Sequence, residues 1–144
     1  MTFKPADDNW EQRVRASFAR QGAMHYIGAT IQTLEPGRCA IALPFRPELA
    51  QQHGYFHAGI VSAIVDSAGG YAALTLFPPG SEVLTVEFKI NLMAPANGAL
   101  LIAEGRVIRS GRTLTVCTGE AHSMSGDART PCALMQQTLM RVKA

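Results

Sequence analysis

The sequence has little charge and no cluster of basic residues, and both shortages exclude classes of protein. Lys, Arg, Asp and Glu make up 17% of the 144 residues, against about 25% in an average soluble protein. The net charge of +2 and the scattered Lys and Arg residues argue against binding to nucleic acid or to an anionic membrane surface. The low charge content indicates instead that part of the surface is buried in an oligomer.

Cysteine is also scarce. The three cysteines, Cys39, Cys117 and Cys132, are far apart, odd in number and without a Cys-x-x-Cys spacing. This pattern argues against a disulfide framework or a zinc site and fits a reducing cytoplasm. His53 and His57 have a spacing that binds metal on a helix, but His53 precedes the expected helix and no third ligand accompanies them.

The longest apolar stretch, residues 58–77, has the length of a membrane span. Asp66 lies at its centre, Gly69 and Gly70 follow, and no Lys or Arg anchors flank it, so a span is not expected. The polar N-terminus, residues 1–8, does not have the pattern of a secretory signal. The sequence therefore predicts a cytoplasmic protein without a membrane partner.

The pattern of elements predicts one α+β domain, residues 1–144. Trp10, Val14 and Phe18 have helical spacing, Gly22 ends that helix, and residues 78–80, Pro-Pro-Gly, end the apolar helix. The predicted elements are a helix to about residue 20, strands at 26–34 and 38–44, the helix at 58–77, and strands at 82–94, 99–109, 113–124 and 133–142. An antiparallel sheet curled around a single apolar helix satisfies this order.

Asp66 is the most informative residue, because an ionised carboxylate inside an apolar helix is costly to desolvate. The same helix opens with His57, Ala58 and Gly59, a start that exposes backbone N–H groups at its positive end. A buried acid and an electropositive helix start together indicate chemistry on a polarised carbonyl group.

Three segments in this order resemble hotdog-fold acyl-CoA thioesterases of the PaaI type, a family related to phenylacetic acid degradation. Residues 54–59, Gly-Tyr-Phe-His-Ala-Gly, followed by Asp66, are similar to the family's G-x-x-H-G-G…D signature. Residues 84–95 resemble its long central strand, and residues 109–114 resemble its hairpin beside coenzyme A. The resemblance implies a hotdog fold, a curved antiparallel sheet wrapped around one long central helix.

Two positions depart from the family pattern. Ala58 stands where the family usually has a second glycine, which is harmless if the backbone N–H is the acting group. Gln51 stands where the family often has asparagine, and Gln52 lies beside it. Either glutamine retains an amide but adds a methylene group.

The resemblance implies hydrolysis of acyl-CoA thioesters to the free acid and coenzyme A, with no metal or organic cofactor, since coenzyme A is part of the substrate. Asp66 would act as nucleophile or as general base, and the Ala58 N–H would stabilise the charge that develops on the carbonyl oxygen. Gln51 or Gln52 would orient the carbonyl group or the water, and Thr85 matches a hydroxyl that holds the water. The substrate-binding set would comprise His57, Gly59, Arg109, Ser110, Gly111, Arg112 and Thr113.

Other interpretations remain open at this point. The fold could carry a non-catalytic acyl-CoA binding module, or a hydratase that uses His57 and Asp66 as an acid/base pair. His57 is better explained as a structural residue that bonds backbone at the helix start, and Arg109 and Arg112 as solvated charges or as ligands of the nucleotide phosphates. In the family the acid and the oxyanion donor face each other across a dimer interface, so a homodimer or homotetramer is expected.

Overall fold

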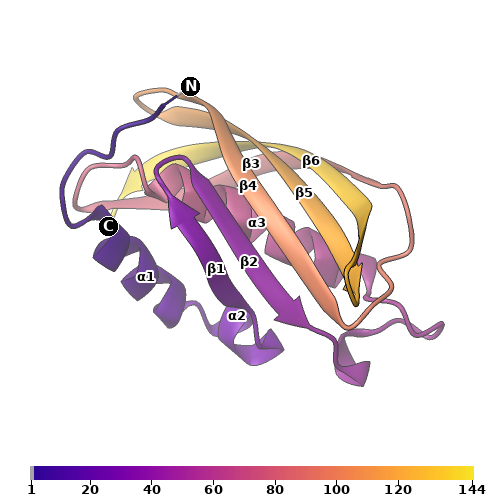
Figure 1. The fold of residues 1–144 in the computed structure, drawn as a ribbon. Coiled ribbons are helices and arrows are strands. Elements are labelled where there is room, and N and C mark those ends of the chain that lie inside the picture. Colours follow the sequence, from indigo (N-terminus) through magenta and orange to yellow (C-terminus); the bar gives the residue numbers. More distant parts are fainter. Residues whose placement is uncertain (1) are drawn as a thin grey trace.

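A six-stranded antiparallel sheet curves around one long helix in the computed structural model, which describes residues 2–144 (Figure 1). The elements are α1 (Trp10–Arg20), α2 (Gly22–Ile27), β1 (Thr30–Glu35), β2 (Arg38–Pro44), a short 3-10 helix (Pro47–Leu49), α3 (Ala58–Leu74), β3 (Ser81–Leu92), β4 (Leu100–Ser110), β5 (Leu114–Ser125) and β6 (Ala128–Lys143). The strands lie in the order β1-β2-β4-β5-β6-β3. The predicted α+β hotdog architecture is confirmed.

Two glycines set the close approach of α3 to the sheet. Gly105 of β4 and Gly119 of β5 lie directly opposite each other in the strand pair. A Cβ atom on Gly105 would lie 2.3 Å from backbone atoms of Ala68 and Gly69, and one on Gly119 would lie 2.5 Å from the Val65 side chain. Because neither glycine carries a Cβ atom, the middle of α3 packs directly on the strands.

The expectation of a strand at 26–34 is wrong in its first part. Residues 22–27 form α2, and β1 begins only at Thr30. Met24 and Ile27 are buried at helical spacing, whereas Tyr26 between them is 82% exposed. Gly28 then ends α2 with φ at 85°, a left-handed conformation. The burial of two apolar residues three positions apart therefore overrides the strand preference of Tyr26 and Ile27.

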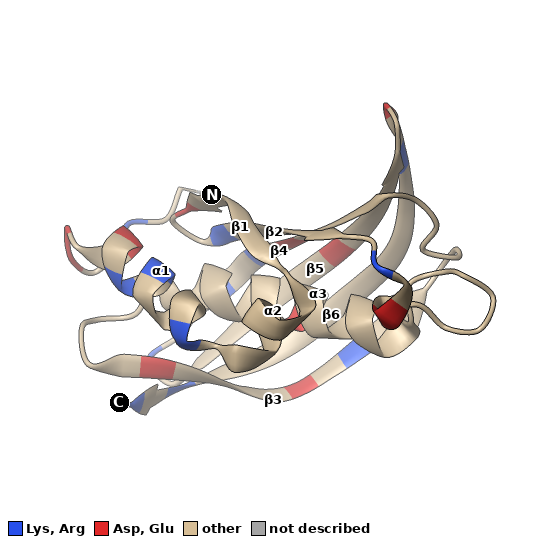
Figure 2. Ribbon diagram, turned by 90° about the horizontal axis from the view of Figure 1, so that it is seen from below, with Lys and Arg blue, Asp and Glu red and all other residues tan. Residues whose placement is uncertain are grey.

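The edge strand β3 is long and carries several exposed apolar side chains. It pairs with β6 on one side, and its other side is an edge of the sheet (Figure 2). Leu84, Val86 and Leu92 are 55%, 54% and 52% exposed. Such an edge presents unpaired backbone N–H and C=O groups and favours pairing with another chain. Among residues 2–144 no helix is long and apolar enough to cross a membrane.

Candidate functional site

Asp66 projects from the middle of α3 towards β3 and β6. Its Oδ1 accepts two hydrogen bonds, from Thr85 Oγ1 at 2.7 Å and from Gln137 Nε2 at 2.9 Å. Its Oδ2 accepts none from residues 2–144. Burial raises the pKa of Asp66 above its ordinary value, although both hydrogen bonds act in the opposite direction. One oxygen is thus fixed while the other is free to meet water or substrate.

Thr85 reaches Asp66 from the edge strand, next to an irregularity in the ladder. The pairing of β3 with β6 shifts register between Thr85 and Glu87, so that Thr85 pairs with Leu139 and Glu87 with Thr138. A bulge of this kind re-aims side chains and is frequent beside active sites. The structure thus brings together Asp66 and Thr85, two residues that the family resemblance assigns to one site.

Gln137 is a residue that the sequence analysis missed. It is fully buried on β6, and its Nε2 also lies 3.3 Å from the backbone oxygen of Asp66. A signal was present in the sequence, because Met135, Gln137 and Leu139 alternate with exposed or partly exposed residues and so share the inward face of the strand. A polar residue at an inward position among apolar neighbours marks a site that needs a hydrogen-bond donor.

The start of α3 has one capped and one free backbone donor. His57 Nδ1 accepts a hydrogen bond from the Gly59 N–H at 2.8 Å, so His57 caps the helix, as the structural interpretation of this residue predicts. The exposed Ala58 donates its N–H to no other group among residues 2–144. This N–H lies at the positive end of the helix and is available to a carbonyl oxygen.

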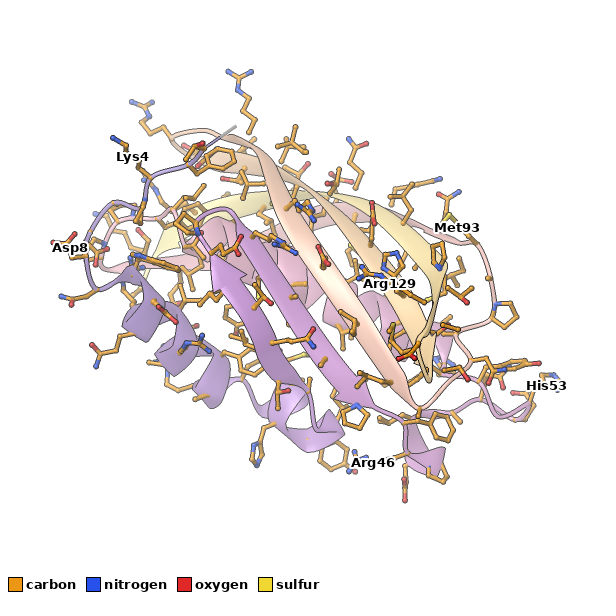
Figure 3. The ribbon with its side chains drawn as sticks, in the orientation of Figure 1. Lys4, Asp8, Arg46, His53, Met93 and Arg129 are labelled. Atoms are coloured by element: carbon orange, nitrogen blue, oxygen red, sulfur yellow. The ribbon has the colours of Figure 1, made fainter. Side chains whose placement is uncertain are left out.

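A cavity of about 460 Å³ opens beside Ala58. Gln51 lines it but Gln52 does not, so Gln51 is the glutamine placed at the site. Gln51 Oε1 accepts hydrogen bonds from the backbone N–H groups of His53 at 2.6 Å and Tyr55 at 3.3 Å. The other lining residues are Tyr55, Phe56, Val61, Leu92, Met93, Ala94, Pro95, Ala96 and Cys132. Figure 3 shows His53 and Met93 at the same end of the molecule.

Within one chain the two halves of the expected site are separated. Ala58 and Asp66 are eight residues apart on α3, a rise of about 12 Å at 1.5 Å per residue. The carbon of a reacting carbonyl group must lie about 3 Å from the attacking atom, and its oxygen about 3 Å from the oxyanion donor. A base that acts through a water molecule is only one hydrogen bond farther away. His57 is farther still from Asp66, so these residues form no acid/base pair in the chain. One subunit alone therefore does not assemble the complete expected constellation.

The hairpin between β4 and β5 lies away from the cavity of its own chain. It stands at the end of β4 opposite to the cavity (Figure 1). Through the strand register, Ser110 is aligned with Thr115, Leu139 and then Thr85, so the hairpin belongs to the end of the sheet that holds Asp66. Five exposed residues form it: Arg109, Ser110, Gly111, Arg112 and Thr113.

Comparisons with known proteins agree on one family. A sequence model described as Thioesterase superfamily matches residues 53–128. A Saccharolobus solfataricus protein named as a candidate esterase is 33% identical over 101 residues, which cover 70% of this chain and 71% of that protein. The structure of a thioesterase family protein from Silicibacter pomeroyi is 46% identical, with a TM-score of 0.92 over 94% of this chain and 99% of that chain.

The E. coli PaaI protein from the phenylacetic acid degradation operon is similar in fold. Its structure superposes with a TM-score of 0.84, covers 94% of this chain and 95% of that chain, and is 18% identical in sequence. At this identity the comparison concerns the arrangement of the backbone alone.

Proposed function

Because the chain belongs to the thioesterase superfamily, we propose that it hydrolyses acyl-CoA thioesters and is an enzyme of the PaaI type, with Asp66 as its catalytic carboxylate. One observation carries the proposal. Thr85 and Gln137 hold Oδ1 of a partly buried Asp66, and Oδ2 is left open. A carboxylate with one fixed and one open oxygen is suited to accept a proton from water.

In the proposed reaction Asp66 is the general base. Oδ2 takes a proton from a water molecule, whose oxygen attacks the thioester carbon. Thr85 Oγ1 accepts a hydrogen bond from the second O–H of that water, and this second proton stays on the oxygen. The carbonyl oxygen becomes an oxyanion and is stabilised by the Ala58 N–H and the positive end of α3. The intermediate collapses, the C–S bond breaks, and the leaving thiolate takes up the proton held by Asp66.

The alternative role of Asp66 is that of a nucleophile, and a single turnover in ¹⁸O-labelled water tests for a nucleophile whose anhydride is hydrolysed at the aspartyl carbon. With enzyme in excess, a general base delivers the labelled oxygen into the first product acid. A nucleophile that forms an acyl–aspartyl anhydride, hydrolysed at the aspartyl carbon, delivers an unlabelled enzyme oxygen instead. Unlabelled acid in the first turnover would contradict the general-base role.

The proposed site is shared between two copies of the chain. Antiparallel pairing of β3 with β3 of a second copy, centred between Phe88 and Lys89, would set Thr85 opposite Leu92 of that copy. Since Thr85 contacts Asp66 and Leu92 lines the cavity beside Ala58, each acid would then face the helix start of the other chain. The position of β3 at the edge of the sheet and its exposed apolar side chains support this homodimer, which can in turn assemble into a homotetramer.

Mixing two inactive variants tests the shared site. Asp66→Ala lacks the base and Ala58→Pro lacks the donor, so a mixed dimer has one intact and one doubly defective site. Random exchange of subunits should restore about a quarter of wild-type activity if the dimer is twofold symmetric. Mixtures that stay inactive, although the subunits exchange, would show that base and donor come from the same chain.

The reaction itself is tested with a panel of acyl-CoA substrates and a thiol reagent that detects released coenzyme A. Tyr55 and Phe56 line the cavity, so aryl and medium-chain acyl groups belong in the panel. Tyr71 does not line this cavity and packs against Phe18, with the ring centres 5.2 Å apart. Binding without release of thiol would favour the non-catalytic acyl-CoA binding module.

A further inference from the structure

Gln137 is fully buried between β6 and α3, and in the reaction proposed above it contacts neither the water nor the substrate. Its Nε2 lies 2.9 Å from Oδ1 and 3.3 Å from the backbone oxygen of Asp66. Both contacts are to acceptors, so the amide must turn its nitrogen towards Asp66. The reverse orientation would set the amide oxygen against two other oxygens.

The amide oxygen of Gln137 has space around it but no hydrogen-bond partner among the described residues. This oxygen, Oε1, is buried. It faces Gly69, one turn after Asp66 on α3, where a Cβ atom would lie 1.8 Å from Oε1 and 2.6 Å from Cδ. An unpaired buried oxygen is unfavourable for stability. The favourable contact at this position is therefore the hydrogen bond that Gln137 Nε2 donates to Asp66.

We propose that Gln137 is a positioning residue. Its amide fits beside Gly69 because this residue has no side chain, and it holds Oδ1 of Asp66 so that Oδ2 points to the reacting water. This inference rests on the proposed function. The same N–H also favours the ionised carboxylate, which is the form that accepts a proton. Gln137 touches neither water nor substrate in this scheme and acts through Asp66 alone.

The surroundings of Asp66 allow its ionisation to be followed in the pH dependence of kcat/KM. Its pKa is raised by burial and lowered by the hydrogen bonds of Thr85 and Gln137, with no contribution from a charged neighbour among residues 2–144. Cys117 of β5 pairs with Gln137, and burial raises the pKa of its thiol to about 12. Burial also raises the pKa of Tyr71 on α3. Glu87 of β3 accepts a hydrogen bond from Thr138 and does not contact Asp66.

Two neighbouring glycines supply a matched test. In Gly69→Ala the new methyl group overlaps the end of the Gln137 side chain, which is flexible and moves away from Asp66. In Gly70→Ala the nearest atom, Val83 Cγ1, is 3.9 Å away, an ordinary contact. Both variants make the same change within α3, so they share the gain in helix propensity. Only Gly69→Ala displaces the amide.

Steady-state kinetics of the variants, measured from acid to neutral pH, test the positioning role. For Gly69→Ala and for Gln137→Met we expect the acid limb of kcat/KM to move to higher pH by about one unit, the effect of one hydrogen bond to a charged group. We also expect kcat to fall at neutral pH. Gly70→Ala and Gln136→Met, which changes the exposed neighbour of Gln137, should keep the wild-type profile.

An acid limb and a kcat at wild-type values in Gly69→Ala or Gln137→Met would overturn the positioning role, while an inactive Asp66→Asn would leave the proposed function standing. If Gln137→Met does not fold, Gly69→Ala alone decides. A fully active Asp66→Asn would instead refute the proposed function itself.

Discussion

Replacing Ala58 by proline deletes the proposed oxyanion donor with little disturbance of the fold. Ala58 is the first residue of α3, a position where proline is favoured because that N–H has no partner within the helix. The preceding residue, His57, has φ −61° and ψ 138°, which lies in the extended region that a residue before proline requires. The variant should therefore fold, and its free energy of unfolding should rise by about 0.4–1 kcal/mol.

The kinetic effect should be large. Loss of one oxyanion donor typically lowers kcat by about 10²–10³-fold, or about 2.7–4 kcal/mol of transition-state stabilisation. Ala58→Gly retains the N–H and should keep most of the activity. An S-alkyl coenzyme A, which lacks the thioester carbonyl group, should bind Ala58→Pro and wild type with equal affinity. A folded Ala58→Pro with wild-type kcat would refute the assignment of this N–H.

Three further outcomes are expected. Neutralising Arg109 and Arg112 to glutamine should raise KM for an acyl-CoA with little change in kcat, because the nucleotide is held alike in the ground and transition states. The rise in KM should be smaller at high salt, which screens the charges. An equal effect on a pantetheine thioester would contradict this. Gly105→Ala should lower the free energy of unfolding in urea by about 3 kcal/mol, because its Cβ would lie 2.3 Å from helix backbone; stability equal to that of Gly70→Ala would contradict the packing argument. Because burial raises the pKa of Asp66 in the folded state, wild type loses stability as pH rises above the unfolded value of about 3.9. Asp66→Asn should therefore be more stable than wild type at pH 7 but not below a pH of about 3.9. Equal stabilities at pH 7 would contradict this reasoning.

Much of the architecture follows from local patterns in the sequence. The helix predicted at 58–77 is present at 58–74, and three of the four long strands after it lie within a few residues of their predicted bounds, because apolar period and turn residues agree there. The last strand, predicted at 133–142, begins earlier, at Ala128. The family resemblance assigned Asp66 and Thr85 to one site, and their side chains are joined by a hydrogen bond.

The remainder depends on contacts that no local pattern records. Gln137 is 71 residues from Asp66 in the chain, and its role depends on the missing Cβ atom of Gly69, which the sequence analysis did not single out as part of the site. The choice of Gln51 over Gln52 depends on how the loop folds over the cavity. The helix α2 forms because Met24 and Ile27 are buried against the core, which is a tertiary effect.

Turnover by Asp66→Asn is the most direct test of the central claim. Asparagine keeps the shape of the side chain and an oxygen that can accept the bonds from Thr85 and Gln137, but it cannot take a proton from water. We predict a folded variant with the wild-type oligomeric state and a kcat on acyl-CoA lower by about 10²–10⁴-fold. A kcat close to that of wild type would contradict the assignment of Asp66 as the catalytic carboxylate.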